Sequence, residues 1–298
     1  MIKSNELELY GSIGYTYLRN NICNKDIIIF ADMHDILPEC KNNYINIKDL
    51  LISKFNTSKI FLEEIPSYEH LKKYSGLIEL WSNSKHTQDI KNLYLKYQDI
   101  IEGIDIRYYL IPFNIEIINN NNLNTQIKKI KLSEYIKDLY DFFYFKKNIS
   151  KMSYFNYYIL NSHILCIKNI LFSNPSKSII SHFNKIKNKF LDFINSNNDL
   201  LDKTIFDIYN NKSGFFILLD EIIDDCMEWY CCYLIDIYNL PKIIIHAGLF
   251  HTSKINDLLF KYYDYENIES IGIVKISQGV EDNVDLSCKK ISLKLSNF

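Results

Sequence analysis

Two distant segments of the sequence contain side chains that could do chemistry together. Both are apolar runs that end in acidic or imidazole groups. The first, IIIFADMHD at residues 27–35, ends in Asp32, His34 and Asp35. The second, IIIHAGLFH at residues 243–251, ends in His246 and His251. Neutral imidazole and carboxylate bind Zn²⁺, Mn²⁺ or Co²⁺, and an open coordination position would hold a water molecule.

Charged side chains also follow two other apolar runs. The segment IFLEEIP supplies Glu63 and Glu64, and IEGIDIR supplies Asp105 and Arg107. Neighbouring side chains on a strand point to opposite faces, so only one glutamate can face a common site. We expect this to be Glu63, and Glu64 to be solvated or to start the next helix. Arg107 could hold an oxyanion or a substrate carboxylate. The alternative for Asp105 is a purely structural role, as the partner of Arg107 in an internal salt bridge or as a turn residue.

Short apolar runs predict the strands that position these groups. They cover residues 27–31, 60–62, 100–106 with a continuation through 108–113, 243–246, 271–276 and, at the end of the chain, 286–295. The first, second and fourth runs are apolar throughout, which is typical of parallel strands covered on both faces. Apolar residues at helical spacing, Ile47, Leu50, Leu51 and Phe55, predict a helix between the first two strands. This is a βαβ unit with a right-handed crossover.

The strand ends predict where the site lies. In an open α/β sheet, ligands bind beyond the carboxyl ends of the strands, so the polar groups should converge on one edge. We expect His34, Glu63, His251 and His246 to bind a divalent metal there, with Asp32, Asp35, Glu64 and Asp105 as secondary candidates. A bound metal can lower the pKa of water to about 7, and a second histidine or glutamate can act as a general base or acid. A helix, KINDLLFKYY, should follow His251.

The middle of the chain has a different pattern. An asparagine-rich tract follows residue 113, and residues 127–240 are mostly at helical spacing. We therefore predict an α/β protein with a mostly parallel central sheet flanked by helices and a large all-helical insertion. The α/β domain would comprise residues 1–113 and 241–298, and the insertion residues 114–240. Cys226, Cys231 and Cys232 lie in the last predicted helix of the insertion, and we expect them to pack in the core of the insertion.

Composition excludes several classes of protein. The 298 residues have a net charge of −2 with scattered Lys and Arg, so no nucleic-acid footprint is expected. No stretch approaches the roughly 20 apolar residues that span a bilayer, and the N-terminal segment lacks the apolar core of a signal peptide. We expect a cytoplasmic protein that binds a small-molecule or peptide substrate and no membrane.

Four segments together resemble the erythromycin-esterase/ChaN/TraB–Tiki superfamily. They are ADMHD, FLEEIP, EGIDIR and HAGLFHTSKINDLL. In that family a first strand leads to a histidine, matched by His34, and a second ends in a glutamate, matched by Glu63. A late strand leads into a Gly-x-x-His turn, matched by Gly248 to His251. The resemblance covers the sheet segments, under half of the chain.

The resemblance implies a hydrolase. Its esterases open a macrolide lactone, its Tiki members are metal-dependent proteases, and its ChaN-like members are linked to haem binding. For this chain it implies metal-assisted hydrolysis of an ester or peptide bond, with His34, Glu63 and His251 as catalytic residues. The chemistry of its guanidinium makes Arg107 a fourth catalytic candidate. The sequence departs from the family in two places: Asp32-Met33 replaces the usual glycine before the first histidine, and His246 is an additional histidine.

Two other functions remain open. The Asp32-x-His34 pair is the opening motif of calcineurin-like metallophosphoesterases, but no Gly-Asn-His segment follows. The chain could also be a non-enzymatic binding or host-interaction protein that uses its aromatic-rich insertion. The remaining histidines lie in helical or loop segments without evident partners and are expected to be surface or packing residues: His70, His86, His163 and His182.

Overall fold

The computed structural model describes residues 7–33, 44–66, 85–110, 129–144, 175–211, 213–278 and 288–291. The chain separates into two compact units, which we call the sheet unit and the helical unit. The sheet unit is Met1–Asp105 with Ile237–Phe298, and the helical unit is Ile106–Asp236. The sequence placed the corresponding boundaries at 113/114 and 240/241.

The sheet unit is built on six strands in the order β6-β5-β7-β3-β2-β8. Their bounds are β6 Ile101–Gly103, β5 Lys59–Leu62, β7 Lys242–Gly248, β3 Lys25–Asp32, β2 Gly14–Asn20 and β8 Glu266–Gly272. Neighbours from β6 to β3 are parallel, and β2 and β8 add an antiparallel edge. The predicted mostly parallel α/β class is confirmed.

A second, three-stranded sheet lies in the same unit. Its order is β4-β1-β9, with β1 Leu7–Tyr10, β4 Tyr44–Asn46 and β9 Cys288–Ile291. Strand β1 is parallel to β4 and antiparallel to β9. This sheet therefore joins the beginning and the end of the described chain, and the turn after β1 leads directly into β2 of the main sheet.

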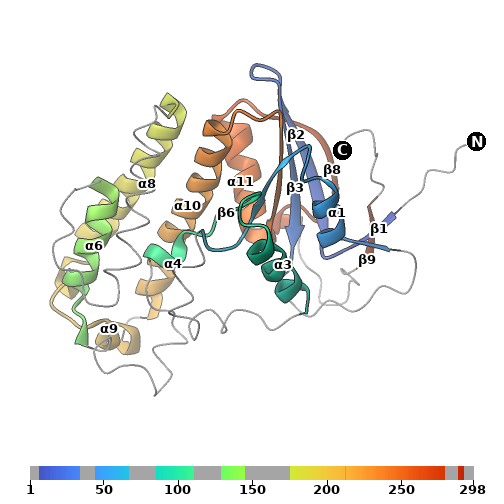
Figure 1. The fold of residues 1–298 in the computed structure, drawn as a ribbon. Coiled ribbons are helices and arrows are strands. Elements are labelled where there is room, and N and C mark those ends of the chain that lie inside the picture. The colour runs from blue at the N-terminus through green and yellow to red at the C-terminus, as the bar shows by residue number, and fades with distance from the viewer. Residues whose placement is uncertain are drawn as a thin grey trace, which may run out of the picture. The chain divides into compact units, whose positions relative to one another are not determined.

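Burial explains why the central strands are so apolar. Residues 27–31 of β3 and 243–245 of β7 are almost fully buried. Helix α11 (Leu249–Tyr262) contacts both strands, and helices α1 (Ile47–Ser53) and α3 (Lys85–Lys96) contact each other, with α3 reaching β6 (Figure 1). The Asn46 side chain caps α1 by accepting a hydrogen bond from the Lys48 amide. Strands covered in this way need no polar face.

The helical unit has its own aromatic core. Its described helices are α4 Arg107–Leu110, α6 Leu132–Tyr144, α8 Lys177–Ser196, η4 Asn198–Leu200, α9 Ile205–Asn211 and α10 Ser213–Ile237, which ends at the unit boundary. The ring centroids of Phe183 and Trp229 are 4.6 Å apart. Cys226, Cys231 and Cys232 are buried in α10, as expected, and burial raises the pKa of each thiol.

Several predicted strand boundaries are wrong. The expected continuation through 108–113 begins as helix α4, and residues 111–113 lie outside the described residues. The predicted run 271–276 overlaps only the end of β8, an edge strand that is largely exposed and so lacks an apolar signature. The run 286–295 contains β9, which pairs in the small sheet. Strands β1, β2 and β4 were not predicted.

The structure also bears on membrane insertion. Within the described part of the chain, no helix is long and apolar enough to cross a membrane. The most apolar long helix, α10, carries acidic side chains at six positions: Asp220, Glu221, Asp224, Asp225, Glu228 and Asp236.

Candidate functional site

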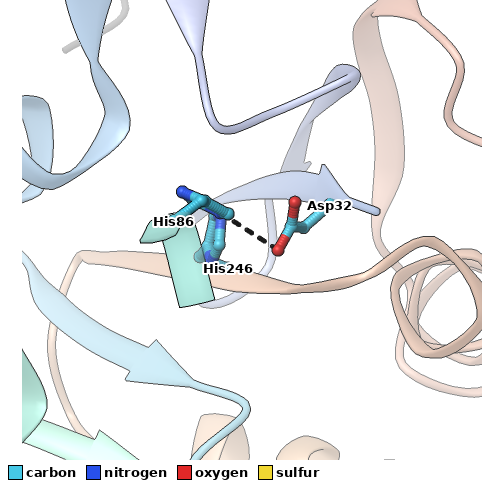
Figure 2. A group of neighbouring side chains, drawn as sticks. All are labelled: Asp32, His86 and His246. Carbon is cyan, nitrogen blue, oxygen red and sulfur yellow. Dashed lines mark hydrogen bonds and ion pairs between the residues drawn. The ribbon is translucent and has the colours of Figure 1, made fainter. Parts of the chain in front are cut away.

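Three buried side chains with metal-ligating chemistry meet at the carboxyl end of β3 and β7. We call Asp32, His86 and His246 the Asp32 cluster (Figure 2). One ligand atom from each residue lies within 4.8 Å of the others. The His86 Nε2 atom is 3.1 Å from Asp32 Oδ2, and the two imidazole centroids are 5.6 Å apart. The residues are 3%, 1% and 3% exposed, respectively.

The sheet register brings two of these residues to one face. In the parallel β3–β7 ladder, His246 is opposite Phe30, and Gly248 is opposite Asp32. Side chains two residues apart on a strand share a face, so Asp32 and His246 point the same way. The alternate residue Ala31 packs on the opposite face with Leu249 of α11. His86 completes the cluster from the first turn of α3.

The turn between β1 and β2 holds the imidazole of His246. The His246 Nε2 atom lies 2.9 Å from the Gly11 carbonyl oxygen. A carbonyl only accepts, so Nε2 donates its proton, and the lone pair of the neutral ring is on Nδ1. Gly11 has a φ of 90°, and a Cβ there would lie 2.5 Å from Cε1 of His86. The position therefore requires glycine both for its backbone conformation and for space.

One nitrogen of the cluster is buried without a hydrogen bond. Among the described residues, nothing pairs with Nδ1 of His86. Leaving such an atom unsatisfied costs about 1–3 kcal/mol. Two imidazoles and a carboxylate are also groups that bind transition-metal ions. The residues present therefore fit a metal ion chemically.

A second group of polar contacts, the Glu63–His251 pair, lies at the same strand ends. Glu63 directly follows β5, and its Oε2 atom accepts a hydrogen bond from the Gly248 amide at 2.7 Å. The other carboxylate oxygen is 3.4 Å from Nε2 of His251, and the two side chains are 9% and 7% exposed. Gly248 is also the N-cap of α11, so the carboxylate accepts a hydrogen bond from a backbone amide that has no partner within the helix.

Gly248 connects the two groups of side chains. Its amide binds Glu63, and its backbone is opposite Asp32 in the β3–β7 ladder. Helix α11 begins at Leu249, earlier than the predicted KINDLLFKYY segment, because Gly248 caps it. His251 therefore lies in the first turn of α11, where it can reach Glu63.

The other residues predicted for the site differ in position and burial. His34 and Asp35 lie outside the described residues, so a meeting of His34 with His251 stays a prediction. Glu64 is partly exposed, and its carbonyl accepts a hydrogen bond from the Asp105 amide at 3.0 Å. Asp105 is buried.

Arg107 is not part of a strand. It begins α4 in the helical unit, where its Nη1 atom is 3.1 Å from Asp224 Oδ1. Asp224 and Asp220 both lie on α10, and burial together with the Asp224 carboxylate raises the pKa of Asp220 to about 6. The guanidinium thus contributes to a charged network of the helical unit, and its predicted role as an oxyanion ligand remains a prediction.

His86 was not among the predicted site residues. It was expected to be a surface or packing residue without an evident partner; it is buried, and the contact with Asp32 shows that the expected lack of a partner is wrong. No local pattern marks it, because its partners are 54 residues upstream and on β7. His182 is buried in α8, as a packing residue would be, and burial lowers its pKa to about 4. His70 and His163 are outside the described residues.

Comparison of the chain with protein-family models, with curated proteins and with solved structures finds no match. The resemblance to the erythromycin-esterase/ChaN/TraB–Tiki superfamily therefore remains a prediction from the short motifs. Of the positions that carry it, the structure describes Glu63, Gly248 and His251, and it brings these three residues into contact.

Proposed function

We propose that this chain is a hydrolase of ester or peptide bonds in which Glu63 and His251 transfer the proton. The observation that carries the proposal is the Glu63 carboxylate. One oxygen is fixed by the Gly248 amide at 2.7 Å, and the other lies 3.4 Å from the His251 imidazole. Both groups are at the carboxyl edge of parallel strands, which is where α/β enzymes bind their ligands.

The chemistry follows from this arrangement. A carboxylate that accepts from one imidazole nitrogen fixes the tautomer of the ring and stabilises the imidazolium that forms when the ring takes a proton. His251 can then act as the general base toward an attacking water and return the proton to the leaving group. The contact of 3.4 Å is long for a hydrogen bond, but such contacts often tighten when substrate binds.

The metal-assisted form of the reaction has residues that could support it. A divalent ion held by the Asp32 cluster would polarise the scissile carbonyl or lower the pKa of a bound water to about 7. The short motifs around Glu63 and His251 resemble those of esterases and metal-dependent proteases, and this favours an acyl bond as the substrate.

The test is hydrolysis of a panel of aryl esters and fluorogenic peptides by the full chain, with and without added Zn²⁺ or Co²⁺. Glu63→Gln and His251→Gln keep side-chain length and a hydrogen-bonding end but remove the acid–base function. Each should lower kcat by about 10²–10⁴-fold, the usual contribution of general acid–base catalysis. The matched control is Glu266→Gln, since Glu266 is an exposed glutamate of the same unit that binds Asn21.

Two results would contradict the proposal. The first is that wild-type protein hydrolyses nothing in the panel under any metal condition. The second is that the Glu63 and His251 variants remain as active as Glu266→Gln while all three unfold at the same denaturant concentration.

A further inference from the structure

We propose that Asp32, His86 and His246 form a binding site for one divalent ion of the zinc class. This ion site goes beyond the proposed hydrolysis, because binding of the ion does not require a substrate, Glu63 or His251. It also differs from the expected ligand set of His34, Glu63, His251 and His246, with which it shares only His246.

The spacing of the three residues suits a small ion. Ligands about 2.0–2.1 Å from a tetrahedral Zn²⁺ lie about 3.3 Å apart. The 3.1 Å separation of His86 Nε2 and Asp32 Oδ2 is close to this value. The set of three atoms spans no more than 4.8 Å, so small rotations of the side chains complete the site without moving the strands.

The contacts around His246 prepare it as a ligand. Metal-binding histidines almost always donate their second ring N–H to a carboxylate, a backbone carbonyl or a water, and this fixes the ring. Nε2 of His246 has this contact with the Gly11 carbonyl at 2.9 Å, which fixes the ring with its lone pair on Nδ1. The Gly11 turn is itself tied to β3, since the Ile13 amide donates to the Ala31 carbonyl at 2.8 Å.

His86 supplies the third ligand, from a different element. Its ring is 1% exposed, and only one of its two nitrogens has a partner among the described residues. That nitrogen, Nε2, lies beside Asp32, so it is the atom that would bind the ion. Nδ1 then carries the ring proton, because one imidazole gives one lone pair to one ion.

The donor set also indicates the kind of ion. Two imidazoles and one carboxylate suit divalent transition metals such as Zn²⁺, Co²⁺ or Fe²⁺, whereas magnesium and calcium prefer sites made of oxygen atoms. Three protein ligands leave one coordination position for water, as in catalytic rather than structural zinc sites.

The experiment uses the full chain, stripped of metal and titrated with Zn²⁺ or Co²⁺. Bound metal is measured by elemental analysis after dialysis, and Co²⁺ is also followed by its visible absorption. Wild type should retain one ion per chain. Three variants keep the existing hydrogen bonds while removing a ligand: Asp32→Asn, His86→Gln and His246→Gln. Each should weaken binding by at least about 100-fold, more than loss of an outer contact does.

Matched controls separate this site from other histidines and from the proposed chemistry. His182→Gln removes a buried histidine of the helical unit and should leave binding unchanged. Glu63→Gln and His251→Gln should retain the ion, even where they abolish hydrolysis. Absence of hydrolysis in a protein that binds its ion would thus reject the proposed function alone.

A measurement on unaltered protein covers the case in which a variant fails to fold. X-ray absorption of the Co²⁺-loaded wild type counts the imidazole ligands, and we expect two with the remaining ligands oxygen. Retention of no ion by the wild type, a count other than two imidazoles, or full binding by all three folded variants would overturn the proposal. The cluster would then be a hydrogen-bonded network that serves only stability.

Discussion

The Asp32 cluster and the Glu63–His251 pair share one sheet edge but differ in how their imidazoles are held. In the pair, a carboxylate fixed by the Gly248 amide faces one imidazole, and both side chains are slightly exposed. In the cluster, two imidazoles and a carboxylate are almost fully buried, and one ring is bound to the Gly11 carbonyl. One imidazole nitrogen of the cluster has no partner among the residues that the structure describes. The first arrangement suits proton transfer near solvent, and the second suits holding an ion.

The strongest test of this difference is whether the members of the pair act as a unit. If Glu63 works only through its contact with His251, the double variant Glu63→Gln/His251→Gln should be no slower than the worse single variant, a fall in kcat of about 10²–10⁴-fold. The measurement is kcat for all three variants on the best substrate. Multiplicative losses would show that the two residues contribute independently.

The Gly11 turn offers a way to damage the cluster without replacing a ligand. Gly11→Ala adds a Cβ 2.5 Å from the His86 ring at a φ of 90°, so we expect a loss of about 1–3 kcal/mol of stability together with weaker Zn²⁺ binding. Denaturant unfolding and metal titration check this. The control Gly214→Ala meets nothing within 4 Å, and equal loss in both variants would argue against a role for the turn.

His182 is a buried histidine of the helical unit, and its titration provides a contrast with the buried histidines of the Asp32 cluster. Burial lowers its pKa to about 4, so it stays neutral in the folded state while the unfolded chain takes up a proton below about pH 6.5. Stability should therefore fall as the pH drops from 6.5 to 4, by about 2–3 kcal/mol from this group. Above about pH 7.5 the group contributes almost no pH dependence, because the ring is neutral in both states.

The measurement is denaturant unfolding of wild type and His182→Gln at pH 4 and pH 7. The difference between the two proteins isolates His182, because every other titrating group is present in both. One of these is Asp220, which opposes the acid loss: burial raises its pKa to about 6, and its neutral form favours the folded state in acid. An identical acid loss in both proteins would show that His182 titrates normally.

Part of this architecture is readable from local sequence. The continuous apolar runs of β3, β5 and β7 predicted buried parallel strands, because strands covered on both faces need no polar residues. The rule that ligands bind at the carboxyl ends then placed Glu63 and His251 at one edge, and they lie 3.4 Å apart. Asp32 and His246 were recognised as candidates for the same reason.

The rest depends on contacts that no local pattern encodes. His86 joins the cluster only because α3 brings its first turn to the sheet, and its own neighbours in sequence are ordinary helix residues. Strand β2 carries Tyr15 and Tyr17, whose polar ends weaken the apolar signal of a buried strand. Gly11 is one of few glycines, yet its role becomes visible only beside the His86 ring.

Anomalous diffraction from crystals grown with Zn²⁺ or Co²⁺ tests the central claim most directly. We predict one strong peak bounded by Asp32, His86 and His246, with Nδ1 of His246 as a ligand and the Glu63–His251 contact intact. A peak at Glu63 and His251 instead, or ordered, ligand-free side chains in the cluster at saturating metal, would contradict it.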